Sequence, residues 1–548
     1  MNYRAFPDKK LGFWDLIKFI KNDILSELPM IIGMVILSGF LSMLIPIGAG
    51  LIVGNIIPEA EVSDLMDLLF ILITGAFAVF AFHITQGISA LRLEGKISLS
   101  LQAGIWDRIL KLPVSFFKNF TSGELAGRAL GVNNIRRILT GSVLSALLSF
   151  LFSCFFVLIL FYFNIKLALI ALGCIGILIF LFFCLYFILI KYQRKASAIQ
   201  GKISGFIYQV VYGISKIRIL GAKDRVFSIW AGEFLKQKQL QFKIREISNY
   251  IYLLVNIFPI IMSIILFFYI GRGLIENISI GEFLAFYVAF TGFQASLLQV
   301  MLAFIEGIAV IPLYERLFPI LHTLPEVTDL KTNPGKLNGD IEIAHVNFRY
   351  SHEGPFILKD FSMKIYAGEF AAITGPSGSG KSTLLRLLLG FEAPQSGSIY
   401  YDGLDLANLD IISVRKQIGV VLQNSKIIAG DIFSNIAGAS ALTIDDAWEA
   451  ARMVGFDKDI EAMPMGMRTS LSDGGETLSG GQRQLILIAR AIVHKPKILF
   501  FDEATSDIDD DAQAMVMKSL HKLNATRVVI AHRGSTVEGA LIQLKIKN

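Results

Sequence analysis

Six long stretches almost without charge constrain the fold of this chain more than any other feature. They cover about residues 30–57, 68–91, 138–165, 167–190, 247–271 and 283–305. Each reaches the roughly 20 residues that an α-helix needs to cross a hydrocarbon core of about 30 Å. Leucine-like residues gain about 0.3–0.6 kcal/mol each at the bilayer centre, whereas a charge there costs about 2.5–3.5 kcal/mol. The sequence therefore predicts six membrane-spanning helices, in a chain whose overall composition is 54% hydrophobic.

The positive charges predict the orientation of these helices. Residues 1–330 hold 28 Lys and Arg against 20 Asp and Glu, and the remaining residues hold 23 against 25. Lys and Arg gather at the N-terminus and in segments 92–137 and 191–245, while the short loops elsewhere hold only Lys166 and Arg272. Because cytoplasmic loops are enriched in Lys and Arg, we expect both long segments and everything after residue 310 to be cytoplasmic. The basic residues form no compact patch with aromatic residues, so nucleic-acid binding is not predicted.

The rest of the first half is less specific. Apolar residues at helical spacing among charges predict an amphipathic helix on the membrane surface within residues 1–28. No cleavable signal peptide is predicted there. Cys154, Cys174 and Cys184 lie in apolar runs without Cys-x-x-Cys spacing, so we expect packing thiols and neither disulfides nor a zinc site. Residues 322–338 are polar with two prolines and predict a linker.

An α/β domain is predicted from Gly339 onward, and its clearest motif is a glycine-rich loop. Residues 375–383 read Gly-Pro-Ser-Gly-Ser-Gly-Lys-Ser-Thr, between a strand predicted at 369–374 and a helical run that starts at Leu384. Such a loop turns its backbone N–H groups around a phosphate chain. Lys381 would reach the outer phosphates and Ser382 would bind Mg²⁺.

Two further motifs supply an acid pair and a second glycine-rich turn. The apolar strand predicted from Ile498 ends in Asp502 and Glu503, which suits one carboxylate for Mg²⁺ and one that orients a water molecule toward the γ-phosphate. Residues 478–482 read Leu-Ser-Gly-Gly-Gln and precede a helical run to Ile492. The positive end of that helix predicts another phosphate contact.

Three polar residues complete the pattern. Gln423 follows an apolar strand predicted at 418–422, His532 follows one at 528–531, and Tyr350 ends a short strand. Taken singly, such a glutamine is usually solvated, such a histidine is usually structural and such a tyrosine usually packs. Their order along one α/β domain favours a shared nucleotide site, with Gln423 and His532 near the γ-phosphate and Tyr350 on the adenine.

Residues 339–535 resemble the ATPase domain of ABC transporters, and residues 478–482 match the signature of that family in full. The resemblance implies adenine stacking by Tyr350, catalysis by Glu503, Lys381 and His532, and a metal site of Ser382, Gln423 and Asp502. It implies that Asp509 lies in a loop that meets the opposite subunit. The implied nucleotide contacts are Gly375, Ser377, Gly378, Ser379, Gly380, Lys381, Ser382 and Thr383, with Ser479, Gly480, Gly481 and Gln482 from the signature.

The first half resembles the membrane part of exporter-type half-transporters, through its six spans and the Leu-Pro-x-Ser-Phe-Phe…Thr-Ser-Gly-Glu-Leu pattern at 112–125. Residues 201–224 and 421–430 are most similar to bacterial peptide- or bacteriocin-exporting members. An N-terminal peptidase domain of the kind that some of those members carry is not recognised, so we expect any leader on the cargo to be removed elsewhere. The sequence also ends soon after His532, where members usually continue, which predicts either a trimmed edge or a truncated chain.

The expected fold is therefore multidomain, with an all-α six-helix transmembrane domain fused to an α/β P-loop nucleotide-binding domain. The expected parts are an amphipathic elbow helix at 1–28, the membrane domain at 29–321, the linker at 322–338 and the ATP-binding cassette at 339–548. We expect a homodimer in the cytoplasmic (inner) membrane that uses ATP and Mg²⁺ to export a peptide. A lipid or hydrophobic-drug exporter is the alternative, and an ABC ATPase without transport and an importer are more distant ones.

Overall fold

The computed structural model describes residues 4–118, 120, 122–272, 278–326, 331–351, 353–376, 378–423, 425–438, 441–504, 508–530 and 542–545. Ser377 and His532, two of the residues predicted to bind or act on nucleotide, lie outside these ranges. The chain divides into two compact units, one drawn from residues 1–325 and one containing residues 326–548. Each unit is described separately below.

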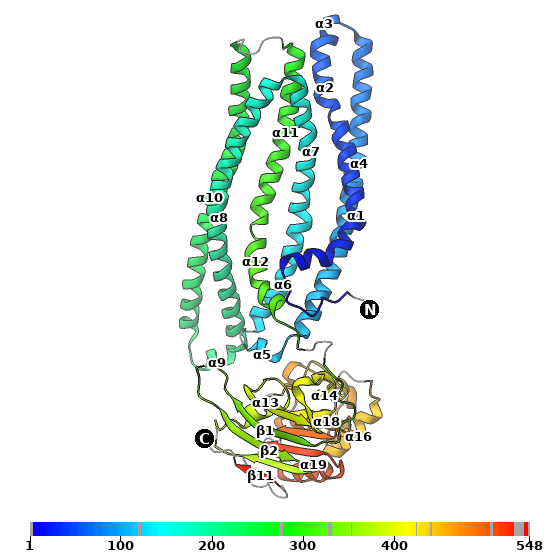
Figure 1. Ribbon diagram of the computed structural model, residues 1–548, viewed down its shortest axis with the longest axis vertical. Helices are drawn as coiled ribbons and strands as arrows, with labels where there is room; N and C mark the ends of the chain where they lie inside the picture. Colours follow the sequence, from blue (N-terminus) through cyan, green and yellow to red (C-terminus); the bar gives the residue numbers. More distant parts are fainter. Residues whose placement is uncertain are drawn as a thin grey trace. The chain divides into compact units, whose positions relative to one another are not determined.

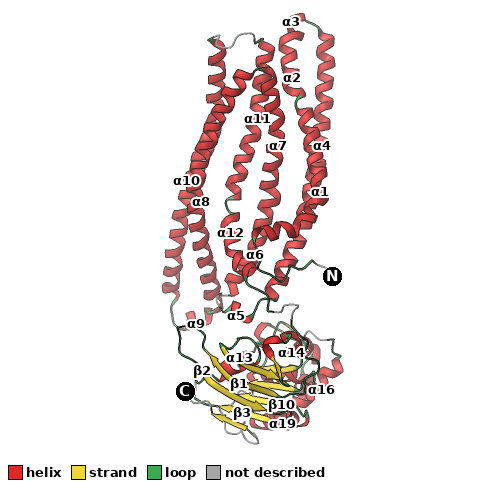
Figure 2. Ribbon diagram, in the orientation of Figure 1, coloured by secondary structure: helices red, strands yellow, loops and turns green. Residues whose placement is uncertain are grey.

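Among the described residues of the first unit, all regular secondary structure is helical (Figures 1 and 2). Six of its helical segments, among the residues that the structure describes, are long and apolar enough to cross a membrane. Each overlaps one of the six predicted stretches, which confirms the all-α membrane part of the expected fold. The helices are α1 (Phe13–Ser42), α2 (Leu44–Leu51), α3 (Ile57–Glu59), α4 (Val62–Leu110), α5 (Val114–Phe117), α6 (Ser122–Ile138), α7 (Leu144–Phe163), α8 (Ile165–Tyr212), α9 (Ile214–Ile219), α10 (Lys223–Gly271), α11 (Ile280–Gly307) and α12 (Val310–His322), with π-helical turns at 52–56 and 139–143.

Three of these helices are much longer than a bilayer requires. α4, α8 and α10 contain 49, 48 and 49 residues, whereas about 20 are enough for one crossing. α8 and α10 run side by side and are joined through the short helix α9 (Figure 1). These helices therefore extend unbroken well beyond the apolar stretches, and the short helices α5 and α9 occupy the two connecting segments.

The N-terminal helix differs from the expected separate element. Residues 4–12 are not helical, and α1 then runs without interruption from Phe13 to Ser42 with Pro29 inside it. The expected boundary at residue 28 thus falls within one helix. Proline has no N–H and collides with the carbonyl four residues earlier, so it bends a helix without ending it. Figure 1 shows the dark-blue start of α1 crossing the bundle before the helix turns along it.

Glycine allows two helices of this unit to approach closely. Gly281, at the start of α11, faces Gly50 of α2 and Gly54 of the following π-helical turn. A Cβ atom placed on Gly281 would lie 2.6 Å from the Gly50 carbonyl oxygen and 2.7 Å from the Gly54 Cα. No larger residue fits this crossing unless the backbones move apart.

A buried arginine joins three segments that are distant in sequence. Arg108, near the end of α4, is only 1% exposed. Its Nη2 donates to the carbonyl oxygens of Lys9 (2.8 Å), Leu321 (3.3 Å) and Thr323 (2.7 Å), and its Nη1 donates to that of Pro7 (3.3 Å). One side chain therefore holds the N-terminal segment and the end of α12 against α4.

The second unit contains two larger sheets, a two-stranded ribbon and surrounding helices, which confirms the α/β part of the expected fold. β2 (Leu358–Ile365), β1 (Ile341–Phe348), β4 (Ser396–Tyr401) and β5 (Leu404–Asp405) form an antiparallel sheet in that order. β11 (Ile542–Lys545), β3 (Phe370–Thr374), β10 (Thr526–Ile530), β9 (Ile498–Asp502) and β6 (Ile418–Val421) form a parallel sheet in that order, and β7 (Gly430–Asp431) pairs with β8 (Ser470–Leu471). The helices are α13 (Lys381–Leu388), α14 (Ile411–Arg415), α15 (Ile432–Ala437), α16 (Ile444–Val454), α17 (Asp457–Ala462), α18 (Gly480–Ile492) and α19 (Asp510–Lys522).

Candidate nucleotide-binding site and membrane cavity

The parallel sheet brings the predicted motifs to one edge. β3, β10, β9 and β6 are neighbours and point the same way, with Ile530 of β10 paired to both Asp502 and Ile373. The carboxyl ends of parallel strands meet at the same edge of a sheet, which is where open α/β sheets bind their ligands. The glycine-rich loop follows β3, Gln423 follows β6, and the acid pair stands at the end of β9.

The loop after β3 has the backbone that a phosphate cradle requires. Gly375, Gly378 and Gly380 have φ values of +154°, +84° and +97°, a region that favours glycine. A Cβ atom on Gly380 would also come within 2.9 Å of Ile357 Cγ2. α13 begins directly after the loop, so its first N–H groups, at Lys381, Ser382 and Thr383, form a positive helix end suited to an anion.

Lys381 occupies the mouth of this loop. Its side chain is buried, and Nζ donates to the carbonyl oxygens of Gly375 (2.8 Å) and Pro376 (2.9 Å). The ammonium group is thus held over the loop where the phosphates of a nucleotide would lie. The Ser379 hydroxyl is buried within the same loop.

Tyr350 lies beside the loop as the adenine-stacking prediction requires. Its hydroxyl is 3.2 Å from Thr383 Oγ1, and its ring meets Phe348 edge to face at 5.0 Å between centroids. The side chain remains 53% exposed. An edge contact with Phe348 leaves a ring face available for stacking on a flat base.

In the acid pair, Asp502 is buried, and Glu503 is held in a strained backbone conformation by two glutamine amides and a backbone hydrogen bond. Asp502 is only 4% exposed at the end of β9, and Glu503 follows it at φ +54° with its N–H donating to Ile530 O at 3.2 Å. Gln423 Nε2 donates to Glu503 Oε2 at 3.1 Å, which joins two predicted residues directly. Gln484 Nε2 donates to the Glu503 carbonyl at 3.2 Å. No sequence motif pointed to Gln484, because this residue reaches Glu503 only through the packing of α18 against β6, the strand beside β9.

The signature residues begin α18 in a closed capping arrangement. Ser479 Oγ accepts from the Gln482 N–H (3.2 Å), and Gln482 Oε1 accepts from the Ser479 N–H (3.1 Å). The Ser479 hydroxyl keeps its hydrogen for a phosphate oxygen, and the N–H groups of Gly480 and Gly481 lie in the first turn, where a helix has no internal acceptors for them. Farther along α18, Arg490 Nη2 donates to Asn435 Oδ1 of α15 at 2.6 Å, and burial lowers the pKa of Arg490.

Asp509 caps a helix. Its Oδ1 accepts from the Ala512 N–H at 3.2 Å at the start of α19, and the residue is exposed. Capping uses one carboxylate oxygen, so the contact with an opposite subunit that the resemblance implies is compatible with this geometry.

The donor set at this edge fits Mg²⁺ better than a transition metal. Among the described residues, no three or more His, Cys, Asp and Glu side chains cluster as metal ligands. Ser382, Gln423 and Asp502 instead offer hydroxyl, amide and carboxylate oxygens. Mg²⁺ prefers such oxygen ligands, usually one or two from the protein with the rest from water and phosphates.

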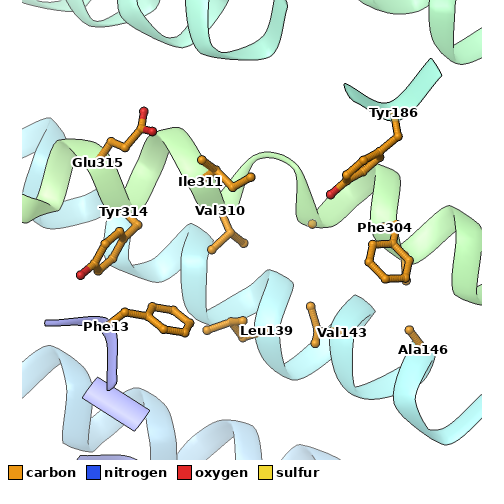
Figure 3. Close-up of a pocket in the computed structure, with 12 residues that line it drawn as sticks. Phe13, Leu139, Val143, Ala146, Tyr186, Phe304, Val310, Ile311, Tyr314 and Glu315 are labelled. Atoms are coloured by element: carbon orange, nitrogen blue, oxygen red, sulfur yellow. The ribbon is translucent and has the colours of Figure 1, made fainter. Parts of the chain in front are cut away.

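The first unit contains an apolar cavity of about 560 Å³, shown in Figure 3. Phe304, Val310 and Ile311 from α11 and α12, Leu139 and Val143 from the neighbouring segment, and Phe13 of α1 surround it. Tyr186 of α8 points into the same space, whereas the Glu315 carboxylate points away (Figure 3). A second apolar cavity of about 430 Å³ shares Val143, Ala146 and Phe304 with the first.

Comparison with known proteins identifies both units. Residues 358–506 match the ABC transporter family, and residues 28–297 match the ABC transporter transmembrane region. The alpha-hemolysin translocation ATP-binding protein HlyB of Escherichia coli O157:H7 is 32% identical over 491 residues, which are 87% of this chain and 67% of that protein. The toxin RTX-I translocation ATP-binding protein of Actinobacillus pleuropneumoniae is 31% identical over 454 residues, 81% of this chain and 64% of that protein. The chain thus spans about two thirds of the length of these curated relatives.

The solved structures give the same fold. The structure of a bacterial Atm1-family ABC exporter with ATP bound superposes with a TM-score of 0.87 at 21% identity, covering 96% of this chain and 94% of that one. The half-transporter architecture carries one membrane domain and one ATPase, and it implies embedding in a membrane and pairing with a second half. The chain belongs to the ABC transporters, as a multi-pass exporter half-transporter whose cytoplasmic unit binds ATP and whose ATPase activity is coupled to transport.

Proposed function

We propose that this half-transporter exports a peptide, of the bacteriocin-like or protein-toxin class, across the cytoplasmic (inner) membrane as a homodimer. The observation that carries the proposal is the similarity, at 31–32% identity over most of the chain, to proteins named for toxin translocation. The expected division into an elbow at 1–28, a membrane domain at 29–321, a linker at 322–338 and a cassette at 339–548 belongs to the same proposal, with the helical part of the elbow formed by the start of α1 from Phe13 onward.

The chemistry of the membrane cavity supports a cargo with apolar side chains. Aromatic residues, among them Tyr186, Phe304 and Phe13, share the walls of the two cavities with aliphatic residues. A cavity of this kind binds its ligand by removing apolar surface from water, at about 25 cal/mol per Å². A lipid or hydrophobic-drug cargo is the second candidate, because an almost wholly apolar wall that includes Phe13 of the N-terminal helix would also accept an acyl chain.

We propose a separate role for each residue of the nucleotide site. Lys381 exchanges its two loop carbonyls for phosphate oxygens when ATP enters, and the N–H groups of the loop and of α13 hold the phosphate chain. Tyr350 stacks on the adenine, and Ser377 contributes to the loop. Glu503, oriented by Gln423, holds the attacking water, and His532 contacts the γ-phosphate. Ser382, Gln423 and Asp502 would hold Mg²⁺, which when bound neutralises charge between the β- and γ-phosphates.

The dimer follows from the division of roles within one cassette. The signature at the start of α18 is a phosphate-binding helix end separate from the loop that starts α13. We propose that each signature closes on ATP held by the partner copy, with Asp509 at that junction. All the motif residues are present in this chain, which favours two working sites in a homodimer over a heterodimer with one degenerate site.

Purified protein in lipid vesicles tests the cargo. ATPase stimulation and ATP-dependent uptake are compared for small leader-bearing peptides encoded near the gene, for lipid-linked substrates and for cationic dyes, with Glu503→Gln protein as the inactive control. The proposal expects stimulation and uptake with peptides. Stimulation and uptake with lipids or dyes and with no peptide would assign the alternative cargo.

A further inference from the structure

A third cavity in the first unit is polar, unlike the two apolar ones. It encloses about 620 Å³ between α6, α8, α10 and α12. Its ionisable lining residues are Glu124 and Arg128 from α6, Lys202 from α8, Glu233 from α10 and Arg316 from α12. Phe206 and Trp230 add aromatic surface. The volume lies within the usual range for small-ligand sites, about 300–1,000 Å³.

Both acidic residues of this cavity are already engaged. Glu124 Oε1 accepts from Arg128 Nη2 at 2.8 Å and from its Nε at 3.2 Å. Arg128 also donates to the Arg316 carbonyl and lies over the Phe120 ring at 4.6 Å. Glu233 accepts from Lys236 at 2.7 Å. Each acid is therefore already paired with one other cation at contact distance.

Among the described residues, Arg316 and Lys202 have no acidic partner in contact, although Glu124 acts on Arg316 and Lys202 acts on Glu233 electrostatically at longer range. Among the described residues, the side chains of Arg316 and Lys202 make no ion pair within 4 Å and no hydrogen bond. The Arg316 guanidinium passes between two glycines, since a Cβ on Gly201 would lie 3.2 Å from its Nη2 and one on Gly127 would lie 3.8 Å from it. The two glycines thus leave room for the Arg316 guanidinium, which has no contacting acid among the described residues and lies near a second arginine, Arg128.

The position of this cavity points to a ligand from the cytosol. Gly201 lies eleven residues beyond the end of the apolar stretch at residue 190, about 16 Å along α8 at 1.5 Å per residue. That distance takes the cavity out of the hydrocarbon and past the depth of lipid headgroups next to it. Two cations that no acid contacts favour an anionic ligand, and a guanidinium fork matches a carboxylate in a bidentate geometry.

We propose that this cavity binds a carboxylate group of an acidic, apolar-flanked segment of the cargo on the cytoplasmic side of the membrane. The inference rests on the proposed peptide export. Arg316 would hold the carboxylate by two parallel hydrogen bonds, and Lys202 would add a second positive charge. Phe206 and Trp230 would take the apolar residues beside the carboxylate.

The test is equilibrium binding to full-length protein in lipid nanodiscs without nucleotide. The probe is a short peptide with two glutamates between phenylalanines, and its matched control replaces both glutamates by glutamine and carries a C-terminal amide. Arg316→Gln and Lys202→Gln are each expected to weaken binding of the acidic peptide about tenfold to a hundredfold, because each removes one charged contact. Lys195→Gln, on the same helix but outside the cavity, should leave it unchanged.

Further measurements support or contradict the proposal. Binding of the acidic peptide should fall steeply with ionic strength, and Gly201→Ala, which crowds the guanidinium without removing charge, should weaken it as well. Equal binding of the acidic and neutral peptides, or binding that Arg316→Gln and Lys202→Gln leave intact, would overturn the proposal. So would binding of phenyl phosphate with Arg316 dependence but of no acidic peptide. Basal ATP hydrolysis of each variant reports whether it has folded.

The vesicle uptake assay separates this proposal from the proposed function. If peptides are taken up and the Arg316→Gln and Lys202→Gln variants transport them as well as the native protein, the carboxylate site is wrong while peptide export stands. If no peptide is transported although the acidic peptide binds through Arg316, peptide export is wrong.

Discussion

At the scale of one residue, Glu503 adopts a strained backbone conformation at the candidate nucleotide site. Its φ of +54° is a left-handed conformation that costs a non-glycine residue roughly 1–2 kcal/mol. Three hydrogen bonds offset this cost. The Glu503 N–H donates to the Ile530 carbonyl, the Glu503 carbonyl accepts from Gln484, and the carboxylate accepts from Gln423. Strained backbone of this kind gathers where a side chain must be aimed. We infer that the conformation turns the carboxylate toward the sheet edge.

Replacing Glu503 by glutamine should stop hydrolysis without stopping binding. Glutamine keeps the shape of the side chain and can still accept from Gln423, but it cannot take a proton from water. We expect the rate of phosphate release to fall at least about a hundredfold, the size of a general-base contribution. Lys381→Ala should lose both hydrolysis and nucleotide affinity. Glu503→Gln protein that hydrolysed ATP at the native rate would remove Glu503 from the mechanism.

Gln423 offers a finer test of the same geometry. Its hydrogen bond to a carboxylate is of the kind worth about 1.5–3 kcal/mol. We expect Gln423→Ala to lower the turnover number about tenfold, because Glu503 loses its guide, while ATP affinity changes much less. Gln417→Ala, which removes a glutamine that bonds Leu337 and Gly335 away from the acid pair, serves as the control. A larger loss of ATP affinity than of turnover would contradict a guiding role.

The sequence predicted which residues meet at the site but not how they engage one another. Parallel strand order brings the glycine-rich loop, Gln423 and the acid pair together, since these three follow buried strands whose carboxyl ends share an edge. The contact of Gln423 with Glu503 and the folding of Lys381 onto Gly375 depend on side-chain rotamers. The same holds for the reciprocal bonds of Ser479 and Gln482. Rotamers are set by packing, which no motif encodes.

At the scale of elements, the crossing of α2 and α11 depends on the absence of side chains. Gly281→Ala would place a methyl group 2.6 Å from the Gly50 carbonyl, so the helices must separate. Overpacking of this kind typically costs about 1–3 kcal/mol, and we expect a lower thermal midpoint for the membrane unit. Gly176→Ala in α8, where nothing lies within 4 Å, is the matched control and should not be destabilised. Equal midpoints for both variants would contradict the close crossing.

Arg108 stabilises the packing of elements in a second way, through hydrogen bonds to distant segments. Arg108→Gln would withdraw a charged donor from four carbonyl groups, all of which are distant from Arg108 in sequence. We expect the free energy of unfolding to fall by at least about 2 kcal/mol, because buried acceptors lose partners. Proteolysis should also cut more readily near residues 7–9 and 321–323. Arg92→Gln removes an exposed arginine from the same helix and should have neither effect.

Helix continuity was only partly predictable from the sequence. The six apolar stretches located the spans because burial in lipid demands a minimum apolar length. They did not show that α1 would continue through Pro29, since a proline that ends a helix in water can instead bend one. The apolar stretches also gave no indication of the role of Arg108, because the carbonyl groups that it bonds lie together only in the folded chain.

At the scale of the whole molecule, the distribution of Lys and Arg predicts the side of the membrane on which each segment lies. In a background without Cys154, Cys174 and Cys184, a cysteine at Ser204 should react only with a reagent in the cytosol. One at Glu61 should react only from outside, and both positions are exposed. Labelling of right-side-out and inverted vesicles gives the measurement. Cytosolic labelling at position 61 would reverse the topology and put the ATPase out of reach of ATP.

The length of α10 has a mechanical consequence. From Lys223 to Phe258, before Pro259, the helix runs without a break for about 54 Å at 1.5 Å per residue. A rigid rod of that length that pivots by 5° at one end moves its other end by about 5 Å, close to one helical pitch. α8 runs alongside and stiffens the pair. A small angular change at one end of the helix pair is thereby amplified into a displacement of the other end. That displacement is large enough to exchange one set of side-chain contacts for the next.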